Sequence, residues 1–110
     1  MMSKYVASRE QCRQHQIFPG VTLSALPGQE MMLAYVEFEP GAVVEWHSHP
    51  HEQMGFLMEG ELEFFIDEEH YLVQPGQMWR IPGGTRHRVV AGAKPAKALD
   101  VFCPMREDYL

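Results

Sequence analysis

Short runs of alternating apolar and polar residues fill most of the chain, and turn-forming residues separate them. In one such run Leu62, Phe64 and Ile66 fall on one strand face, while Glu61 and Glu63 fall on the other. The turn signals are Pro27-Gly28, Pro40-Gly41, Glu59-Gly60, Asp67-Glu68, Pro75-Gly76, Pro82-Gly83-Gly84 and Gly92. Turns about every eight to twelve residues predict an all-β sandwich or barrel, and no helical period follows residue 20. We therefore predict an all-β fold, a small jelly-roll barrel.

The first twenty residues lack this alternation. They predict an N-terminal arm, residues 1–20, ahead of a single domain, residues 21–110, because 110 residues suffice for one domain. Within the arm, residues 8–16 are polar and predict a short helical turn, which Phe18-Pro19-Gly20 would end.

Strand parity assigns two faces to residues 53–58. If Gln53 points into the barrel, Leu57 does so too, and Met54, Phe56 and Met58 point outward. An outward apolar row on so small a protein needs a cover, either the N-terminal arm or a second subunit. We favour a second subunit and predict a homodimer.

Composition and charge narrow the location and the partners. The net charge of −6 at pH 7 argues against nucleic acid as a partner. The longest apolar run, residues 31–36, is far shorter than the ~20 residues of a membrane helix, and no signal peptide is recognised. The two cysteines do not make a disulfide framework. We expect a cytoplasmic protein without membrane or nucleic-acid partners.

Three histidines and a glutamine predict a metal site built from two glycine-framed motifs. The motifs are Gly41-x5-His47-x-His49-x3-Gln53-x6-Gly60 and Gly76-x5-Pro82-x-Gly84-x2-His87. Residues two apart in a strand share a face, so His47 and His49 present both imidazoles to one point. Imidazole and carbonyl donors suit one divalent transition metal ion, and Ni, Zn, Mn, Co and Fe all remain candidates.

The fourth ligand depends on strand register. Gln53 is favoured by its spacing to Gly60, but a slip of one residue would make Glu52 the ligand instead. With Gln53 all four donors are neutral, so the 2+ charge stays uncompensated and Lewis-acid chemistry is favoured over oxygen redox chemistry. His51 is either a neighbour of this site or an exposed loop residue.

Basic residues gather in residues 75–106, which contain six basic side chains and one acid, Asp100. Arg86 and Arg88 flank His87, so at least one of them is expected near the metal. Basic groups beside a divalent cation would favour a small anionic molecule as the partner.

The last predicted strand carries a carboxylate in an apolar run. Asp100 and Phe102 share one face, and a buried acid must be paired, linked to a metal or catalytic. Either Asp100 forms a structural ion pair with an arginine, or it acts as a general acid/base beside the metal. Arg106 has the fork geometry to hold a carboxylate, although arginines near a terminus are commonly solvated.

The two motifs resemble those of the cupin superfamily over about residues 30–103. The ending Asp-x-Phe-x-Pro-x-Arg-x-Asp-Tyr-Leu, together with His-x-His…Gln, is similar to the pectin-degradation cupins, which act on 4,5-unsaturated uronates. The resemblance implies a cupin domain at residues 21–110 with His47, His49, Gln53 and His87 as metal ligands. It also implies Asp100, Phe102 and Arg106 as active-site residues.

The favoured function is therefore a metal-dependent ring-opening isomerase that converts an unsaturated uronate to its linear keto form. Two alternatives of other classes stay open, an Fe-dependent cupin dioxygenase and a non-enzymatic cupin that binds a small molecule. A cyclase or isomerase of secondary metabolism would use the same chemistry, and only the shape of the pocket would separate it from the favoured function.

Overall fold

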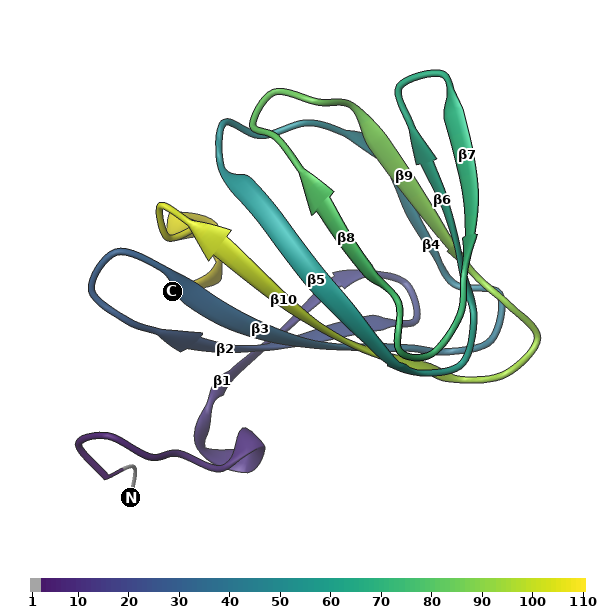
Figure 1. Cartoon of the computed structure of the whole chain (residues 1–110). Helices are drawn as coiled ribbons and strands as arrows, with labels where there is room; N and C mark the ends of the chain where they lie inside the picture. The colour runs from purple at the N-terminus through teal and green to yellow at the C-terminus, as the bar shows by residue number, and fades with distance from the viewer. Residues whose placement is uncertain (1–2) are drawn as a thin grey trace.

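A computed structural model describes residues 3–110 and shows two antiparallel sheets stacked as a jelly roll (Figure 1). The larger sheet, in the order β1-β2-β3-β10-β5-β8, contains Arg13–Phe18, Val21–Pro27, Met32–Phe38, Ala96–Cys103, Glu52–Glu59 and Met78–Ile81. The smaller sheet, in the order β4-β9-β6-β7, contains Val43–His47, His87–Ala91, Leu62–Ile66 and Glu69–Val73. The predicted all-β jelly roll is confirmed.

The N-terminal region differs in part from the prediction. A short 3-10 helix, η1 (Arg9–Gln11), forms the expected helical turn, and Ser8 caps it. Residues 13–18 instead form strand β1, which pairs with β2 at the edge of the larger sheet. The half-buried residues His15 and Ile17 fall on the same face, a pattern too short and too polar to stand out in the sequence. The division at residue 20 stays a prediction.

The core lies between the inner faces of the sheets, and the predicted alternation is confirmed. Along β5, Gln53 is 8% exposed and Leu57 is fully buried, whereas Met54 is 50% and Phe56 40% exposed. The larger sheet also contributes Leu23, Ala34 and Ile81 to the core, and the smaller sheet contributes Leu62 and Phe64.

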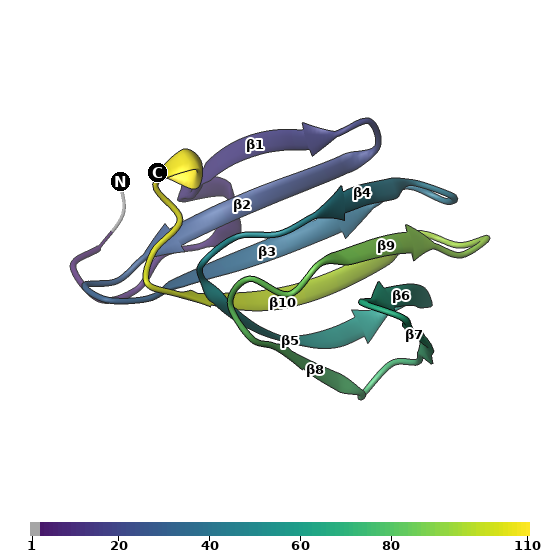
Figure 2. The same cartoon turned by 90° about the horizontal axis from the view of Figure 1, so that it is seen from above.

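The second 3-10 helix, η2 (Glu107–Tyr109), lies next to β1 at the open end of the sandwich (Figure 2). Its buried Tyr109 offers a backbone oxygen 2.9 Å from His15 Nε2, so the C-terminal segment is fastened to the edge strand. Between residues 3 and 110, no helix is long and apolar enough to cross a membrane.

Two turn glycines share a left-handed backbone but differ in their surroundings. Gly60 has φ 81° and Gly76 has φ 90°, a region that side chains with a Cβ disfavour. A Cβ on Gly60 would lie 2.5 Å from the Pro95 carbonyl oxygen, whereas a Cβ on Gly76 would meet nothing within 4 Å. Only Gly60 is therefore constrained by both backbone conformation and space.

We predict that Gly60→Ala lowers the free energy of unfolding more than Gly76→Ala does. Both changes cost about 1–2 kcal/mol of backbone strain, and the clash with Pro95 adds about 1–3 kcal/mol at Gly60. Urea unfolding of the two variants measures the difference. Equal losses of stability would contradict this account of Gly60.

Candidate metal centre

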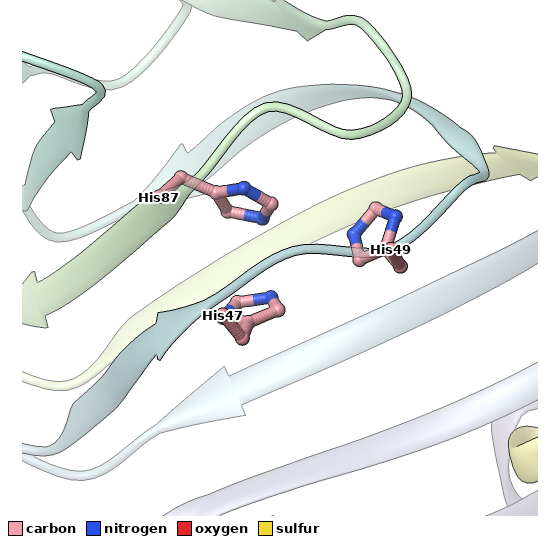
Figure 3. Close-up of side chains that lie close together, drawn as sticks. All are labelled: His47, His49 and His87. Carbon is pink, nitrogen blue, oxygen red and sulfur yellow. The ribbon is translucent and has the colours of Figure 1, made fainter.

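Three histidines converge at the mouth of the sandwich, on the side of the smaller sheet. His47 ends β4, His87 begins β9, and these two residues are paired in register. His49 follows two residues after β4, and all three rings point toward one another (Figure 3). One potential ligand atom from each histidine lies within 4.8 Å of the other two. These three side chains can therefore hold one metal ion.

Backbone carbonyls fix the orientation of each imidazole. The Nδ1 atoms of His47, His49 and His87 lie 2.8, 3.0 and 2.9 Å from the carbonyl oxygens of Glu45, His51 and Thr85, respectively. An Nδ1–H that donates to a carbonyl leaves Nε2 unprotonated, which is the usual arrangement of a histidine that binds metal. His87 Nε2 is buried and has no hydrogen-bond partner, as expected of a ligand atom.

Burial keeps the cluster in the neutral form that binds metals. It lowers the pKa of His47 and of His49, and it lowers the pKa of His87 to about 4. The positive charge of Arg106 lowers the pKa of all three further. At neutral pH the imidazoles are therefore uncharged and need not lose a proton before they bind an ion.

Gln53 lies beside the cluster on the larger sheet, and Glu52 does not. The Gln53 side chain is buried and its Oε1 lies 3.1 Å from His49 Nε2, whereas Glu52 is exposed. Two ligand atoms at ~2.1 Å from one ion, about a right angle apart, are separated by ~3 Å. The geometry fits Gln53 as a fourth ligand, and this assignment stays a prediction.

Asp100 lies deeper in the same interior, on β10. Trp79 Nε1 donates a hydrogen bond to Asp100 Oδ1 at 2.8 Å, and the Gln53 side chain donates a second one. Burial nevertheless raises the pKa of Asp100 to about 6. Among residues 3–110 no cation pairs with Asp100, so the alternative of a structural ion pair is wrong.

Phe102 and Arg106 complete the group of predicted residues. The Phe102 ring meets the His49 ring edge-on at 5.6 Å, and the Arg106 guanidinium lies over the rings of Phe102 and Tyr109 at 5.3 and 4.3 Å. Asp108 accepts two hydrogen bonds from Arg106, from Nε at 3.3 Å and from Nη2 at 2.9 Å. The guanidinium is thus held at the mouth of the site by stacking and by a carboxylate.

A cavity of about 320 Å³ joins these residues. Its lining includes His47, His87, Gln53, Asp100, Phe102 and Arg106. This volume falls at the lower end of the range for small-molecule sites, about 300–1,000 Å³. The cavity suits a small polar molecule that approaches the histidine cluster, a protonatable carboxyl and a guanidinium together.

Arg86 and Arg88 do not approach the site. Because His87 points inward, its two neighbours point outward: Arg86 stacks over Trp46 at 4.9 Å and Arg88 pairs with Glu45 at 3.1 Å. The expectation that one of them lies near the histidines is wrong, and Arg106 supplies the positive charge instead.

Two residues of the site escaped the sequence analysis. Trp79 has a weak signal, since it shares strand parity with the buried Ile81. Tyr109 lies in a 3-10 turn beyond the last strand, so strand alternation gives no signal for it, although the C-terminal motif contains it. His51, left open above, is half-buried with its ring 5.5 Å from that of His49, so it is a neighbour of the cluster.

Comparisons with known proteins agree with the fold. A family model described as "Cupin domain" matches residues 34–102. KdgF from Halomonas sp. has 26% sequence identity and a TM-score of 0.88, over 98% of this chain and 100% of that one. An RmlC-like cupin from Shewanella frigidimarina has 27% identity and a TM-score of 0.88, over 98% and 97%.

A structure described as a predicted oxalate decarboxylase, from Thermotoga maritima, has 16% identity and a TM-score of 0.76, over 90% of this chain and 98% of that one. That likeness concerns the fold alone. No curated protein matches the chain significantly in sequence.

We predict that Asp100→Asn stabilises the metal-free protein more at about pH 8 than at about pH 4.5. A carboxyl whose pKa is raised by folding favours the folded state at low pH, and this contribution is lost as the pH rises from 3.8 through about 6. Asparagine does not titrate, so the gain in free energy of unfolding from Asp100→Asn should be larger at pH 8 than at pH 4.5, by on the order of 2 kcal/mol. Urea unfolding of the variant and the parent, with chelator and at both pH values, tests this prediction. An equal gain in stability at the two pH values would contradict a raised pKa of Asp100.

Proposed function

Because the chain belongs to the cupin domain family, we propose that it is a metal-dependent enzyme acting on a small anionic sugar acid. The proposed reaction opens a 4,5-unsaturated uronate and tautomerises it to the linear keto form. One observation carries the proposal: a cluster of neutral ligand atoms, a carboxyl with a pKa of about 6 and a guanidinium border one small cavity. The resemblance of the C-terminal motif to the pectin-degradation cupins supports this choice of substrate.

We propose His47, His49, His87 and Gln53 as the residues that hold the metal ion. All four donors are neutral, so a bound divalent ion would keep its full charge and act as a Lewis acid toward substrate oxygens. The identity of the metal is not fixed by this donor set.

Asp100 has the properties of a proton shuttle for this reaction. Ring opening removes the proton of the anomeric hydroxyl while the ring C–O bond breaks, which yields an aldehyde and an enolate. A proton delivered to the α-carbon of this enolate, the alkene carbon next to the new C–O⁻, then gives the ketone. A carboxyl with a pKa of about 6 is populated in both protonation states near neutral pH, so it can accept the first proton and return it.

Arg106 would bind the carboxylate of the substrate. Asp108 occupies the Nε side of the guanidinium, which leaves the N–H groups of Nη1 available. The stacked rings of Phe102 and Tyr109 hold the group in place, so little side-chain freedom is lost on binding. Phe102 itself would shape the wall that contacts the sugar.

We also propose a homodimer formed through the outer face of the larger sheet, and a cytoplasmic location. Met54, Phe56 and Met78 lie on neighbouring strands β5 and β8 and are 50%, 40% and 73% exposed, with Leu33 on β3 39% exposed. The corresponding face of the smaller sheet is different, because arginines cover its aromatic rings.

We predict that the purified protein accelerates the loss of the ultraviolet absorbance of 4,5-unsaturated galacturonate and that a chelator abolishes the acceleration. Asp100→Asn should keep bound metal but lower kcat about 100-fold or more, since the proton shuttle is removed. His70→Ala, which changes an exposed histidine on β7, is the matched control and should behave as the parent.

Absorbance loss no faster than the spontaneous rate, in protein with metal confirmed bound, would refute the substrate assignment. Oxygen consumption that depends on Fe(II) and substrate would then favour the dioxygenase. Binding of the sugar acid without turnover would favour a non-enzymatic cupin.

We predict a dimer by size-exclusion chromatography with light scattering, and a monomer after the double change Met54→Glu and Met78→Glu. Charges buried at the centre of an apolar interface would remain unpaired and oppose association. Leu72→Glu on the smaller sheet, 56% exposed in the parent, should leave the dimer intact. A monomeric parent protein would rule out this interface.

A further inference from the structure

We infer that Trp79 and Gly55 are positioning residues that fix the carboxyl of Asp100, Trp79 by donating a hydrogen bond across β5 and Gly55 by leaving its path open. The inference rests on the proposed function for its consequence in catalysis. The hydrogen bond and the packing that support it belong to the structure itself.

Strand order brings the two side chains to opposite sides of one glycine. β5 lies between β10 and β8 in the larger sheet (Figure 1), and Gly55 is paired in register with Asp100 on one side and with Trp79 on the other. All three residues face the interior, so a side chain on Gly55 would stand between the other two. The long indole reaches across the empty position and donates to Asp100 Oδ1 at 2.8 Å.

Lack of space for a side chain, and not backbone conformation, explains why residue 55 is a glycine. The φ angle of Gly55 is not positive, so its backbone conformation suits any residue. Glycine in the interior of a strand is otherwise unfavourable. A Cβ at this position would overlap Trp79 Nε1 and Cε2 as well as Asp100 Oδ1. The atoms it would displace are the donor and the acceptor of the hydrogen bond.

Trp79 is a rigid donor. Its ring is 7% exposed and packs against Phe64 of the smaller sheet, with ring centroids 4.7 Å apart. The position of its N–H is therefore set by the core that joins the two sheets. A carboxyl held at Oδ1 by such a donor keeps its orientation in the interior.

Asp100 also orients a residue that lies beside the histidine cluster. Asp100 accepts a hydrogen bond from the Gln53 side chain, which assigns the amide nitrogen to Asp100. The amide oxygen then faces His49 Nε2, 3.1 Å away. Hydrogen bonds from Trp79 and Gln53 thus hold Asp100, and they leave the Gln53 amide oxygen beside His49 Nε2 as a second acceptor. This arrangement accounts for glutamine at position 53, because a glutamate there would set two carboxylates side by side.

The hydrogen bond can be followed by NMR without any assay of activity. The chain has two tryptophans, so Trp46→Phe leaves a single indole N–H signal, that of Trp79. We expect this signal to exchange slowly with water. Gly55→Ala in the same background should speed its exchange and should shift the side-chain amide signals of Gln53. Unchanged indole and Gln53 signals in Gly55→Ala would overturn the inference.

Kinetics on the unsaturated uronate tests the consequence. Trp79→Phe keeps an aromatic ring without the N–H, and we expect it and Gly55→Ala to lower kcat about 10- to 100-fold. If the two residues only position Asp100, KM and bound metal per chain should equal the parent values. A general structural role would change these quantities as well. Trp46→Phe, which changes an exposed tryptophan, is the matched control and should keep full kcat.

The two experiments separate failure of this inference from failure of the proposed function. Parent-like kcat in both variants, with the indole signal changed in Gly55→Ala, would show that the hydrogen bond does not position a catalytic group. A parent protein without turnover would reject the uronate reaction instead, and the NMR signals would still decide whether Trp79 and Gly55 hold Asp100. Backbone amide spectra identify any variant that fails to fold.

Discussion

A polar group buried inside this sandwich costs free energy unless it finds a partner there, because water is largely excluded from the interior. The three Nδ1 atoms of the histidine cluster are paired with backbone carbonyls, and Asp100 is paired with Trp79 and Gln53. What remains in the site is the ligand atoms of the three histidines, which lie close together, and the buried Nε2 of His87 has no hydrogen-bond partner. The hydrogen bonds already made inside the site therefore determine which atoms remain free to bind an ion or a substrate.

The fold and the histidine cluster were predictable because both follow from the two-residue period of a strand. That period sets His47 and His49 on one side, separates Gln53 from Glu52, and aligns Asp100 with Phe102. The same rule, applied to His87, excludes Arg86 and Arg88 from the site. Strand parity thus carried most of the correct predictions and also explains one that was wrong.

The remaining features depend on which strands become neighbours, and parity does not determine this. Asp100, Gly55 and Trp79 meet only because β10, β5 and β8 are adjacent, although they are far apart in the sequence. β1 joins the sheet through pairing with β2, and Tyr109 reaches the cavity through a turn that has no period. A glycine at position 55 is informative only when its two cross-strand neighbours are known.

The candidate ligands are divided between the sheets: His47 and His87 belong to the smaller one and Gln53 to the larger. An ion bound by these side chains would link the two sheets at the open end of the sandwich. A ligand that binds only the folded state adds to its stability in proportion to the logarithm of its free concentration. The melting temperature would then rise with the concentration of free metal ion. The cation that raises it most at a given concentration would be the one that the protein binds most tightly.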